Sequence, residues 1–218
     1  MVRYLLFDLD GTLTDPKEGI TKCFQYALEA FGITPPPADE LTWVIGPPLM
    51  ESFEQGCGFS EERAQEATTK YRERYEAVGW GENRLYAGVA EALTCLREAG
   101  FVLAVATSKP EHMAKRILEH FGLEGFFEVI GGATMDRSRS KKADVVSYTL
   151  ERLGVLKREE ALMIGDRKYD VEGAGQLGIP CLGVTWGYGG REELEKAGAV
   201  AVAESMKEMT DYCVSLRK

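Results

Sequence analysis

From Ala87 to Val184, short apolar runs of strand length alternate with amphipathic helical segments. Strands that alternate with helices in this way predict a parallel sheet with helices covering both faces. The apolar run at residues 4–7 is expected to belong to the same sheet. The expected strands are residues 4–7, 101–106, 127–131, 161–165 and 179–184, and the expected helices are residues 87–100, 111–121, 142–153 and 169–177.

A different pattern separates the first strand from the rest of the expected sheet. Ile20, Phe24 and Phe31 recur at helical spacing, and Ser60 is a favourable N-cap residue for a longer helix. No strand pattern appears between residues 15 and 83. The chain is therefore expected to form a Rossmann-like α/β core from residues 1–14 and 85–218, with an α-helical domain of residues 15–84 inserted after the first strand.

The charge balance and the rare residue types limit the classes of function. Lys and Arg total 26 against 35 Asp and Glu, a formal net charge of −9, which argues against a nucleic acid or an anionic membrane as a partner. Two histidines are too few for a multi-histidine metal site, and they make a Ser-His-Asp mechanism a poor candidate. The five cysteines are scattered and never form a C-x-x-C pair, which indicates reduced thiols in the cytoplasm.

Acidic residues stand where two of the expected strands end. Asp8 and Asp10 follow the first strand, and Asp166 and Asp170 follow the strand at residues 161–165. The carboxyl ends of parallel strands form the usual ligand-binding edge of such a sheet. Two carboxylates about 4 Å apart repel by about 4 kcal/mol at an effective dielectric constant of about 20. Each Asp alone could be a turn or cap residue, but their coincidence favours a site for a hard cation, and oxygen ligands favour Mg²⁺ with room for a phosphate.

Four sequence motifs resemble those of the haloacid dehalogenase superfamily, in its phosphatase form. FDLDGTLTD at residues 7–15 resembles the first motif, Thr107 the second, Lys142 the third, and GDRKYD at residues 165–170 the fourth. The motifs occur in the family's order over nearly the whole chain. The helical insertion resembles the mobile cap of the phosphoglycolate phosphatase-like branch, and residues 165–174 and 183–189 are similar to bacterial phosphoglycolate phosphatases or 5′-nucleotidases.

The resemblance implies a role for each matched residue. Asp8 would be the nucleophile that forms an aspartyl-phosphate, and Asp10 would protonate the leaving alkoxide and then deprotonate the attacking water. Thr107 would hydrogen-bond the transferring phosphoryl group, and Lys142 would balance its charge. The implied Mg²⁺ ligands are Asp8, the backbone carbonyl of Asp10, and Asp166, with Asp170 binding directly or supporting a ligand. The expected substrate-binding residues are Gly11, Thr12, Gly46, Ser108 and Lys109.

Several assignments stay open at the level of the sequence. The third-motif lysine is either Lys141 or Lys142, and Lys142 fits the branch better because it immediately precedes the sequence ADVV. Lys109 either attracts anions or is solvated. Gly46, in a rigid GPP turn, either presents backbone groups to the active site or only connects two helices. The GAGQLG match at residues 173–178 to the dinucleotide fingerprint is discounted because it ends a helix instead of following a strand.

The expected function is a Mg²⁺-dependent phosphatase acting on a small-molecule phosphate monoester, either phosphoglycolate-like or a nucleoside 5′-monophosphate. The protein is expected to be a cytoplasmic monomer or weak homodimer. The second acid at Asp10 favours a phosphatase over a dehalogenase, because a dehalogenase has no alkoxide to protonate. The alternatives are a phosphomutase of the β-phosphoglucomutase type and a non-hydrolytic phosphate-binding or phospho-accepting module.

Overall fold

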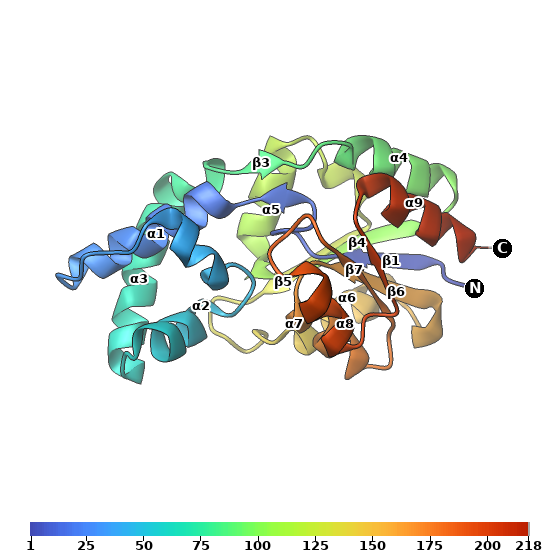
Figure 1. Ribbon diagram of the computed structural model, residues 1–218. Helices are drawn as coiled ribbons and strands as arrows, with labels where there is room; N and C mark the ends of the chain where they lie inside the picture. Colours follow the sequence, from blue (N-terminus) through green and yellow to red (C-terminus); the bar gives the residue numbers. More distant parts are fainter. Residues whose placement is uncertain (218) are drawn as a thin grey trace. The chain divides into compact units, whose positions relative to one another are not determined.

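The computed structural model describes residues 1–217 (Figure 1). The chain divides into two compact units, one that combines residues 1–14 with the chain from Leu85 onward, and one that comprises Asp15–Arg84. The chain passes between the units through two short paired strands, β2 (Thr14–Asp15) and β3 (Arg84–Leu85). Within residues 1–217, none of the helices combines the length and the apolar character needed to cross a lipid bilayer.

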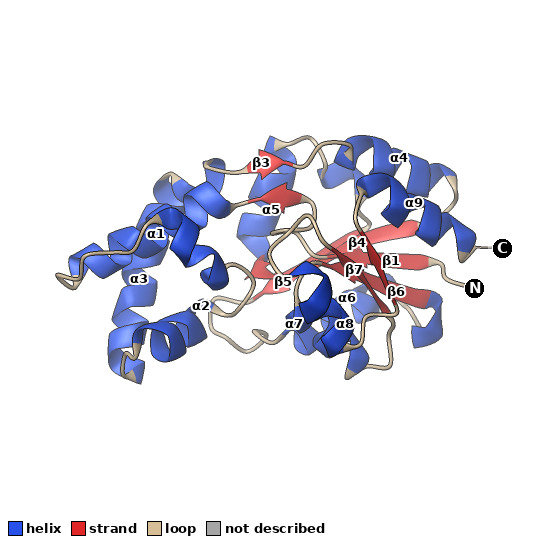
Figure 2. Cartoon of the chain, viewed as in Figure 1, coloured by secondary structure: helices blue, strands red, loops and turns tan. Residues whose placement is uncertain are grey.

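A six-stranded parallel sheet forms the centre of the first unit (Figure 2). The chain winds outward from the central strand β1 in both directions, so the carboxyl ends of β1, β4 and β6 meet where the direction of winding reverses. Open α/β sheets bind their ligands at such a point. The predicted parallel sheet is confirmed. The strands, in their order across the sheet, are β5 (Val129–Ala133), β4 (Val102–Pro110), β1 (Tyr4–Phe7), β6 (Ala161–Gly165), β7 (Cys181–Val184) and β8 (Ala201–Ala203).

Helices cover both faces of this sheet (Figures 1 and 2). On one face α4 packs against α9, and α5 packs on β4 and β5; on the other face α6, α7 and α8 pack in sequence against one another. The bounds are α4 (Val89–Glu98), α5 (Glu111–His120), α6 (Lys142–Leu153), α7 (Lys168–Gly175), α8 (Gly190–Ala197) and α9 (Met206–Ser215), with short 3-10 helices at Glu124–Phe126 and Arg158–Glu160.

The sheet is held by a buried apolar core. Leu5, Leu6 and Phe7 of β1 have no exposed surface, as expected for a central strand that is covered on both faces. Burial of one such side chain is worth about 1.5–3 kcal/mol, so the end of β1 is a rigid base for the polar residues that follow it. One core cluster joins the sheet to α6 and α7 through Leu6, Ala104, Ala106, Val145, Val146, Met163, Val171 and Ala174.

The second unit is built around two packed helices, α1 (Lys17–Ala30) and α3 (Glu61–Ala77). The chain between them forms a 3-10 helix, the short helix α2 and a turn of π-helix, and another 3-10 helix follows α3. These segments are Ala38–Val44, α2 (Leu49–Glu51), Ser52–Gly56 and Gly79–Gly81.

Aromatic side chains form the core of this unit. The rings of Phe24 and Phe53 stack with their centroids 4.4 Å apart, and both side chains are fully buried. Tyr71 and Tyr75 stack on each other at 5.5 Å and are also buried. Ser60 caps α3 because its hydroxyl accepts a hydrogen bond from the backbone N–H of Arg63.

The structure shifts the bounds of several predicted elements and adds elements that the sequence does not predict. β4 continues to Pro110 instead of ending at residue 106, and β5 and β7 begin two residues later than expected, at Val129 and Cys181. The two-residue strands β2 and β3 were not predicted. Neither were α8, β8 and α9, which complete the sheet and its helical layers at the C-terminal side.

Candidate active site

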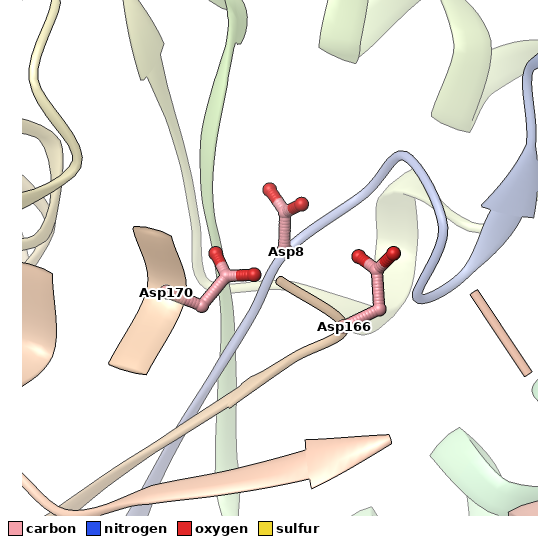
Figure 3. Close-up of side chains that lie close together, drawn as sticks. All are labelled: Asp8, Asp166 and Asp170. Atoms are coloured by element: carbon pink, nitrogen blue, oxygen red, sulfur yellow. The ribbon is translucent and has the colours of Figure 1, made fainter. Parts of the chain in front are cut away.

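Three aspartates gather at the carboxyl edge of the sheet (Figure 3). Asp8 directly follows β1, Asp166 directly follows β6, and Asp170 lies in the first turn of α7. All three are buried, and each offers a carboxylate oxygen that lies within 4.8 Å of the corresponding oxygens of the other two. Residues 158 positions apart in the sequence are thus brought together because parallel strands end at one edge.

The turn after β1 requires a glycine. Leu9 O accepts hydrogen bonds from the backbone N–H groups of Thr12, Leu13 and Thr14, which folds the chain back on itself. Gly11 adopts a φ of 86°, in the left-handed region. A Cβ atom at this position would lie 2.2 Å from Asp166 Oδ2. The turn therefore packs directly against the carboxylate cluster.

Both oxygens of Asp166 are held by hydrogen bonds from the protein. Thr12 Oγ1 donates to Asp166 Oδ1 at 3.3 Å, and the backbone N–H of Tyr188 donates to Asp166 Oδ2 at 2.8 Å. Trp186 Nε1 in turn donates to the carbonyl oxygen of Thr12 at 3.0 Å. The loop after β7 thus orients one of the three carboxylates. The sequence motifs assign no role to this loop, although its glycine-rich sequence, GVTWGYG at residues 183–189, is a signal of close backbone approach.

Lys142 places its ammonium group between two of the aspartates. Its Nζ lies 2.7 Å from Asp8 Oδ1 and 2.7 Å from Asp170 Oδ1, and it donates a further hydrogen bond to Ala106 O at 3.1 Å. Lys141 is exposed. The structure therefore brings Lys142, and not Lys141, to the carboxylate cluster.

The cluster carries more negative charge than Lys142 balances. Burial raises the pKa of Asp170 to about 6, with the Asp8 charge adding to the rise and Lys142 opposing it. Burial also raises the pKa of Asp166 well above its ordinary value, and the charges of Asp170 and Asp8 add to this effect. Burial alone would lower the pKa of Lys142, but attraction from Asp170 and Asp8 outweighs it and raises that pKa. Three buried carboxylates supply only oxygen ligands, and a single ammonium group does not balance their charge. This combination fits a hard divalent cation.

Asp10 lies apart from the three clustered carboxylates and pairs with a different lysine. Lys109 Nζ lies 2.6 Å from Asp10 Oδ2, and the two side chains are only 6% and 13% exposed. Asp10 Oδ1 is buried and has no hydrogen-bond partner among residues 1–217. Burial raises the pKa of Asp10, although the charge of Lys109 opposes the rise.

Thr107 and Ser108 lie on β4 beside this pair. Thr107 is buried, and its hydroxyl oxygen accepts a hydrogen bond from the backbone N–H of Lys109 at 3.3 Å. As an acceptor in that bond, the hydroxyl keeps its proton to donate to another oxygen. Ser108 is partly exposed. Thr107, the residue predicted to donate a hydrogen bond to the phosphoryl group, thus lies at the same edge of the sheet as the aspartates.

One protein family matches most of the chain. The model of the family described as haloacid dehalogenase-like hydrolase matches residues 5–184. The chain belongs to this family. The resemblance that the four motifs carry is confirmed, and the motif residues are those that line the carboxyl edge of the sheet.

Relatives of this haloacid dehalogenase-like hydrolase carry several names. A protein of Pseudomonas aeruginosa named 5′-nucleotidase is 43% identical over 97% of this chain and 91% of its own length. A protein of Mycobacterium tuberculosis named Tyrosine-protein kinase PtkA is 45% identical over 92% of this chain and 68% of its own length. A crystal structure from Clostridium acetobutylicum, described as a predicted phosphatase, is 44% identical, covers 99% of both chains and has a TM-score of 0.96.

Some residues considered for this hydrolase lie elsewhere. Gly46 belongs to the second unit, in the segment between the 3-10 helix Ala38–Val44 and α2, and has a φ of 109°. Its contact with a substrate stays a prediction. His112 is exposed on α5, as expected for a helix-surface histidine. The GAGQLG sequence at residues 173–178 ends α7 and precedes β7, so it does not have the context of a dinucleotide site.

Proposed function

We propose that this hydrolase is a Mg²⁺-dependent phosphatase that hydrolyses a small phosphate monoester through an aspartyl-phosphate on Asp8. The single observation that carries the proposal is the cluster of Asp8, Asp166 and Asp170 with Lys142 Nζ at 2.7 Å from two of them. A nucleophilic carboxylate, a cation site and a fixed ammonium group are the parts that phosphoryl transfer needs. The names of the relatives support a phosphate ester as the substrate.

Mg²⁺ would be held by Asp8, Asp166 and Asp170 together with the backbone carbonyl of Asp10. When bound, the ion would neutralise charge on the phosphoryl oxygens and make phosphorus a better electrophile. The donors are all oxygen atoms, which suits Mg²⁺ and leaves positions for the substrate and water.

The chain's own residues account for the transfer in two steps. In the first step, a carboxylate oxygen of Asp8 forms a bond to phosphorus while the bond from phosphorus to the leaving oxygen breaks, and Asp10 gives its proton to that oxygen. In the second step, Asp10 takes a proton from a water molecule as the water oxygen attacks the same phosphorus. Inorganic phosphate leaves, and the Asp8 carboxylate is restored.

Lys142 and Thr107 would stabilise the phosphoryl group during its transfer. Lys142 Nζ forms an ion pair with Asp8 Oδ1, so its positive charge lies beside the carboxylate that attacks phosphorus. Thr107 would donate its hydroxyl proton to a phosphoryl oxygen. Such fixed donors act without reorganisation in a site that excludes water.

The inserted unit, residues 15–84, would act as a cap that closes over the substrate and selects it. Phosphoglycolate and nucleoside 5′-monophosphates are the substrate classes we propose, and Gly46, Gly11, Thr12, Ser108 and Lys109 are the candidates for contact with them. We also propose that the protein works in the cytoplasm as a monomer or weak homodimer. Its five cysteines are scattered and never form a C-x-x-C pair, which supports the compartment.

A second candidate function is favoured by the relative named Tyrosine-protein kinase PtkA. A phosphoryl group on Asp8 can pass to water, to a protein tyrosine hydroxyl, or to a second hydroxyl of a sugar phosphate. These acceptors define a phosphatase, a kinase and a phosphomutase, and an aspartyl-phosphate that persists defines a phospho-accepting module. The destination of the phosphoryl group therefore separates the four functions.

The deciding experiment follows inorganic phosphate released from phosphoglycolate, nucleoside 5′-monophosphates and p-nitrophenyl phosphate, with Mg²⁺ and with EDTA. We expect Mg²⁺-dependent release by the wild type, none by Asp8→Asn, and unchanged release by Asp211→Asn, a matched change on the exposed face of α9. Borohydride reduction of a rapidly quenched mixture should convert Asp8 to homoserine, detectable by mass spectrometry. Turnover by Asp8→Asn would refute the role of Asp8 as nucleophile. A phosphoryl group that is transferred to a tyrosine or to a sugar hydroxyl, instead of being released as inorganic phosphate, would refute the phosphatase activity.

A further inference from the structure

Lys109 has no part in the two steps described above, although it forms a buried ion pair with Asp10, which acts in both. Lys109 Nζ lies 2.6 Å from Asp10 Oδ2, whereas Lys142 contacts Asp8 and Asp170. The site thus contains two buried lysines that serve different carboxylates. Removal of two charges from water carries a large desolvation penalty, so this arrangement calls for a reason beyond stability.

We propose that Lys109 is a positioning residue, whose ammonium group holds Asp10 Oδ2 so that Oδ1 is the oxygen that gives and takes the proton. This inference rests on the proposed phosphatase function and adds to it a residue that acts through Asp10. Lys109 would determine which carboxyl oxygen of Asp10 faces the leaving group and would fix the orientation of that carboxyl group.

The two oxygens of Asp10 have different surroundings. Oδ2 is held by the ammonium group, while Oδ1 is buried and has no hydrogen-bond partner among the described residues. The ammonium group occupies the Oδ2 side of the carboxyl group, so Oδ1 is the oxygen left for a reacting group. Buried polar atoms normally have partners, and a leaving-group oxygen or an attacking water would supply one for Oδ1.

An irregularity at the end of β4 turns Lys109 into the site. Thr107 pairs with Gly132 of β5 and Pro110 pairs with Ala133, so the two residues between Thr107 and Pro110 have no counterparts in that strand. Such an extra length of strand re-aims the side chains within it. The Lys109 backbone N–H is also fixed by the Thr107 hydroxyl oxygen at 3.3 Å. The lysine is therefore set by the sheet and not by a mobile loop.

A proton carrier can be tested through the leaving group. An alkoxide needs a proton as it departs, whereas p-nitrophenolate leaves readily without one. For an enzyme that forms an aspartyl-phosphate, kcat/KM reports the steps up to departure of the leaving group. The ratio of kcat/KM for glycerol 2-phosphate to kcat/KM for p-nitrophenyl phosphate therefore measures acid catalysis alone, whatever Lys109 does for phosphate binding.

We expect Lys109→Met to lower kcat/KM at least about 100-fold for glycerol 2-phosphate and less than about 5-fold for p-nitrophenyl phosphate, since general acid catalysis contributes about 10²–10⁴-fold. Lys109→Arg, which keeps the charge, should recover most of the loss. Lys196→Met, a matched change at an exposed lysine of α8, should alter neither value. A wild type that shows no Mg²⁺-dependent turnover of either ester would refute the proposed function itself, independently of Lys109.

A double-mutant cycle tests whether Lys109 acts through Asp10, with variants whose circular dichroism matches that of the wild type. Because Lys109 acts through Asp10, the change Lys109→Met should have no further effect on the glycerol 2-phosphate rate once Asp10→Asn is present. Equal losses on both esters would make Lys109 a phosphate ligand, and unchanged values on both would make it structural. Either outcome, or additive losses in the cycle, would overturn the inference.

Discussion

Trp186 Nε1 donates a hydrogen bond of 3.0 Å to the carbonyl oxygen of Thr12, which lies 174 positions earlier in the chain. The bond ties the loop after β7 to the turn after β1. Thr12 in turn donates its hydroxyl proton to Asp166 Oδ1, and Tyr188, two residues after Trp186, donates its backbone N–H to Asp166 Oδ2. The loop and the turn therefore hold one carboxylate from two sides, and the accuracy of the proposed metal site depends on both.

Trp186→Phe tests this connection, because it removes the N–H donor and keeps an aromatic ring. We expect a loss of about 0.5–1.5 kcal/mol in the free energy of unfolding, the usual net value of one hydrogen bond, together with weaker Mg²⁺ binding. Urea unfolding with and without Mg²⁺ measures both effects. Trp43→Phe, which alters a tryptophan that packs on Phe24 in the second unit, should leave Mg²⁺ affinity unchanged. Equal Mg²⁺ affinities for wild type and Trp186→Phe would contradict the prediction.

Gly187→Ala should disturb Asp166 directly. A Cβ atom at position 187 would lie 2.2 Å from Asp166 Oδ2 and 2.4 Å from Gly11 O. We expect Mg²⁺ affinity, measured by isothermal titration calorimetry, to fall by about 10–100-fold, the usual result of disturbing a residue that orients a metal ligand.

The matched control for Gly187→Ala is Gly175→Ala, at the end of α7, where an added Cβ atom would meet nothing within 4 Å. This control should bind Mg²⁺ normally and gain up to about 1 kcal/mol in stability, because alanine is the better helix former. A Gly187→Ala variant that binds like the control would show that the loop can move aside without affecting the carboxylate.

The cluster of aspartates was within reach of sequence reasoning, because parallel strands fix where their carboxyl ends meet. Asp8 and Asp166 directly follow β1 and β6, which pair in parallel from Tyr4 with Ala161 to Phe7 with Ile164. The same logic predicted the parallel sheet and the helices on its faces. It required only the position of each residue at the end of a strand and no knowledge of side-chain direction.

The contacts of Lys109 and Trp186 were not predictable in this way. The sequence predicts that β4 ends at residue 106, whereas the strand continues to Pro110 with a shift in its pairing with β5. That shift, which no hydrophobic pattern encodes, directs Lys109 toward Asp10. Trp186 lies in a loop, where long-range contacts depend on the packed tertiary structure. The strand β8 was missed because its three residues, Ala201–Ala203, are too short for a periodic pattern.

Asp166→Asn should separate metal binding from folding. In the absence of metal, burial and the neighbouring carboxylates raise the pKa of Asp166 well above its ordinary value, so the neutral amide resembles the form that the folded protein prefers. We expect an unfolding free energy without Mg²⁺ that equals or exceeds that of the wild type. The stabilisation by Mg²⁺, about 2.7 kcal/mol at one hundred times the Kd for the wild type, should disappear.

The control for Asp166→Asn is Asp144→Asn, at an exposed aspartate in the first turn of α6. This variant should keep the full response to Mg²⁺, which thermal melting with and without the ion measures. Two results would contradict the prediction: a large loss of stability in metal-free Asp166→Asn, or a Mg²⁺ response that this variant retains.

Mg²⁺ stabilisation should depend on pH with a definite sign. The pKa of Asp170 is raised to about 6 in the folded, metal-free protein from an ordinary value of 3.8, and that of Asp166 is raised as well. A carboxyl group whose pKa is higher in the folded protein than in the unfolded chain contributes its full stabilisation below the unfolded pKa. This contribution is lost as the pH rises through the folded pKa. The metal-free protein should therefore lose stability between about pH 4 and pH 6 through Asp170, and Asp166 should add a loss of the same sign as the pH rises above its ordinary pKa.

Bound Mg²⁺ should reverse this loss, because the ion requires the same carboxylates to be deprotonated. The increase in melting temperature caused by Mg²⁺ should be small near pH 4.5 and should rise as the pH passes through about 6, the folded pKa of Asp170. Asp166→Asn should show almost no Mg²⁺ response at any of these pH values, whereas Asp144→Asn should follow the wild type. A Mg²⁺-induced shift that is the same at pH 4.5 and pH 7.5 would mean that protons and the metal ion do not compete for these carboxylates.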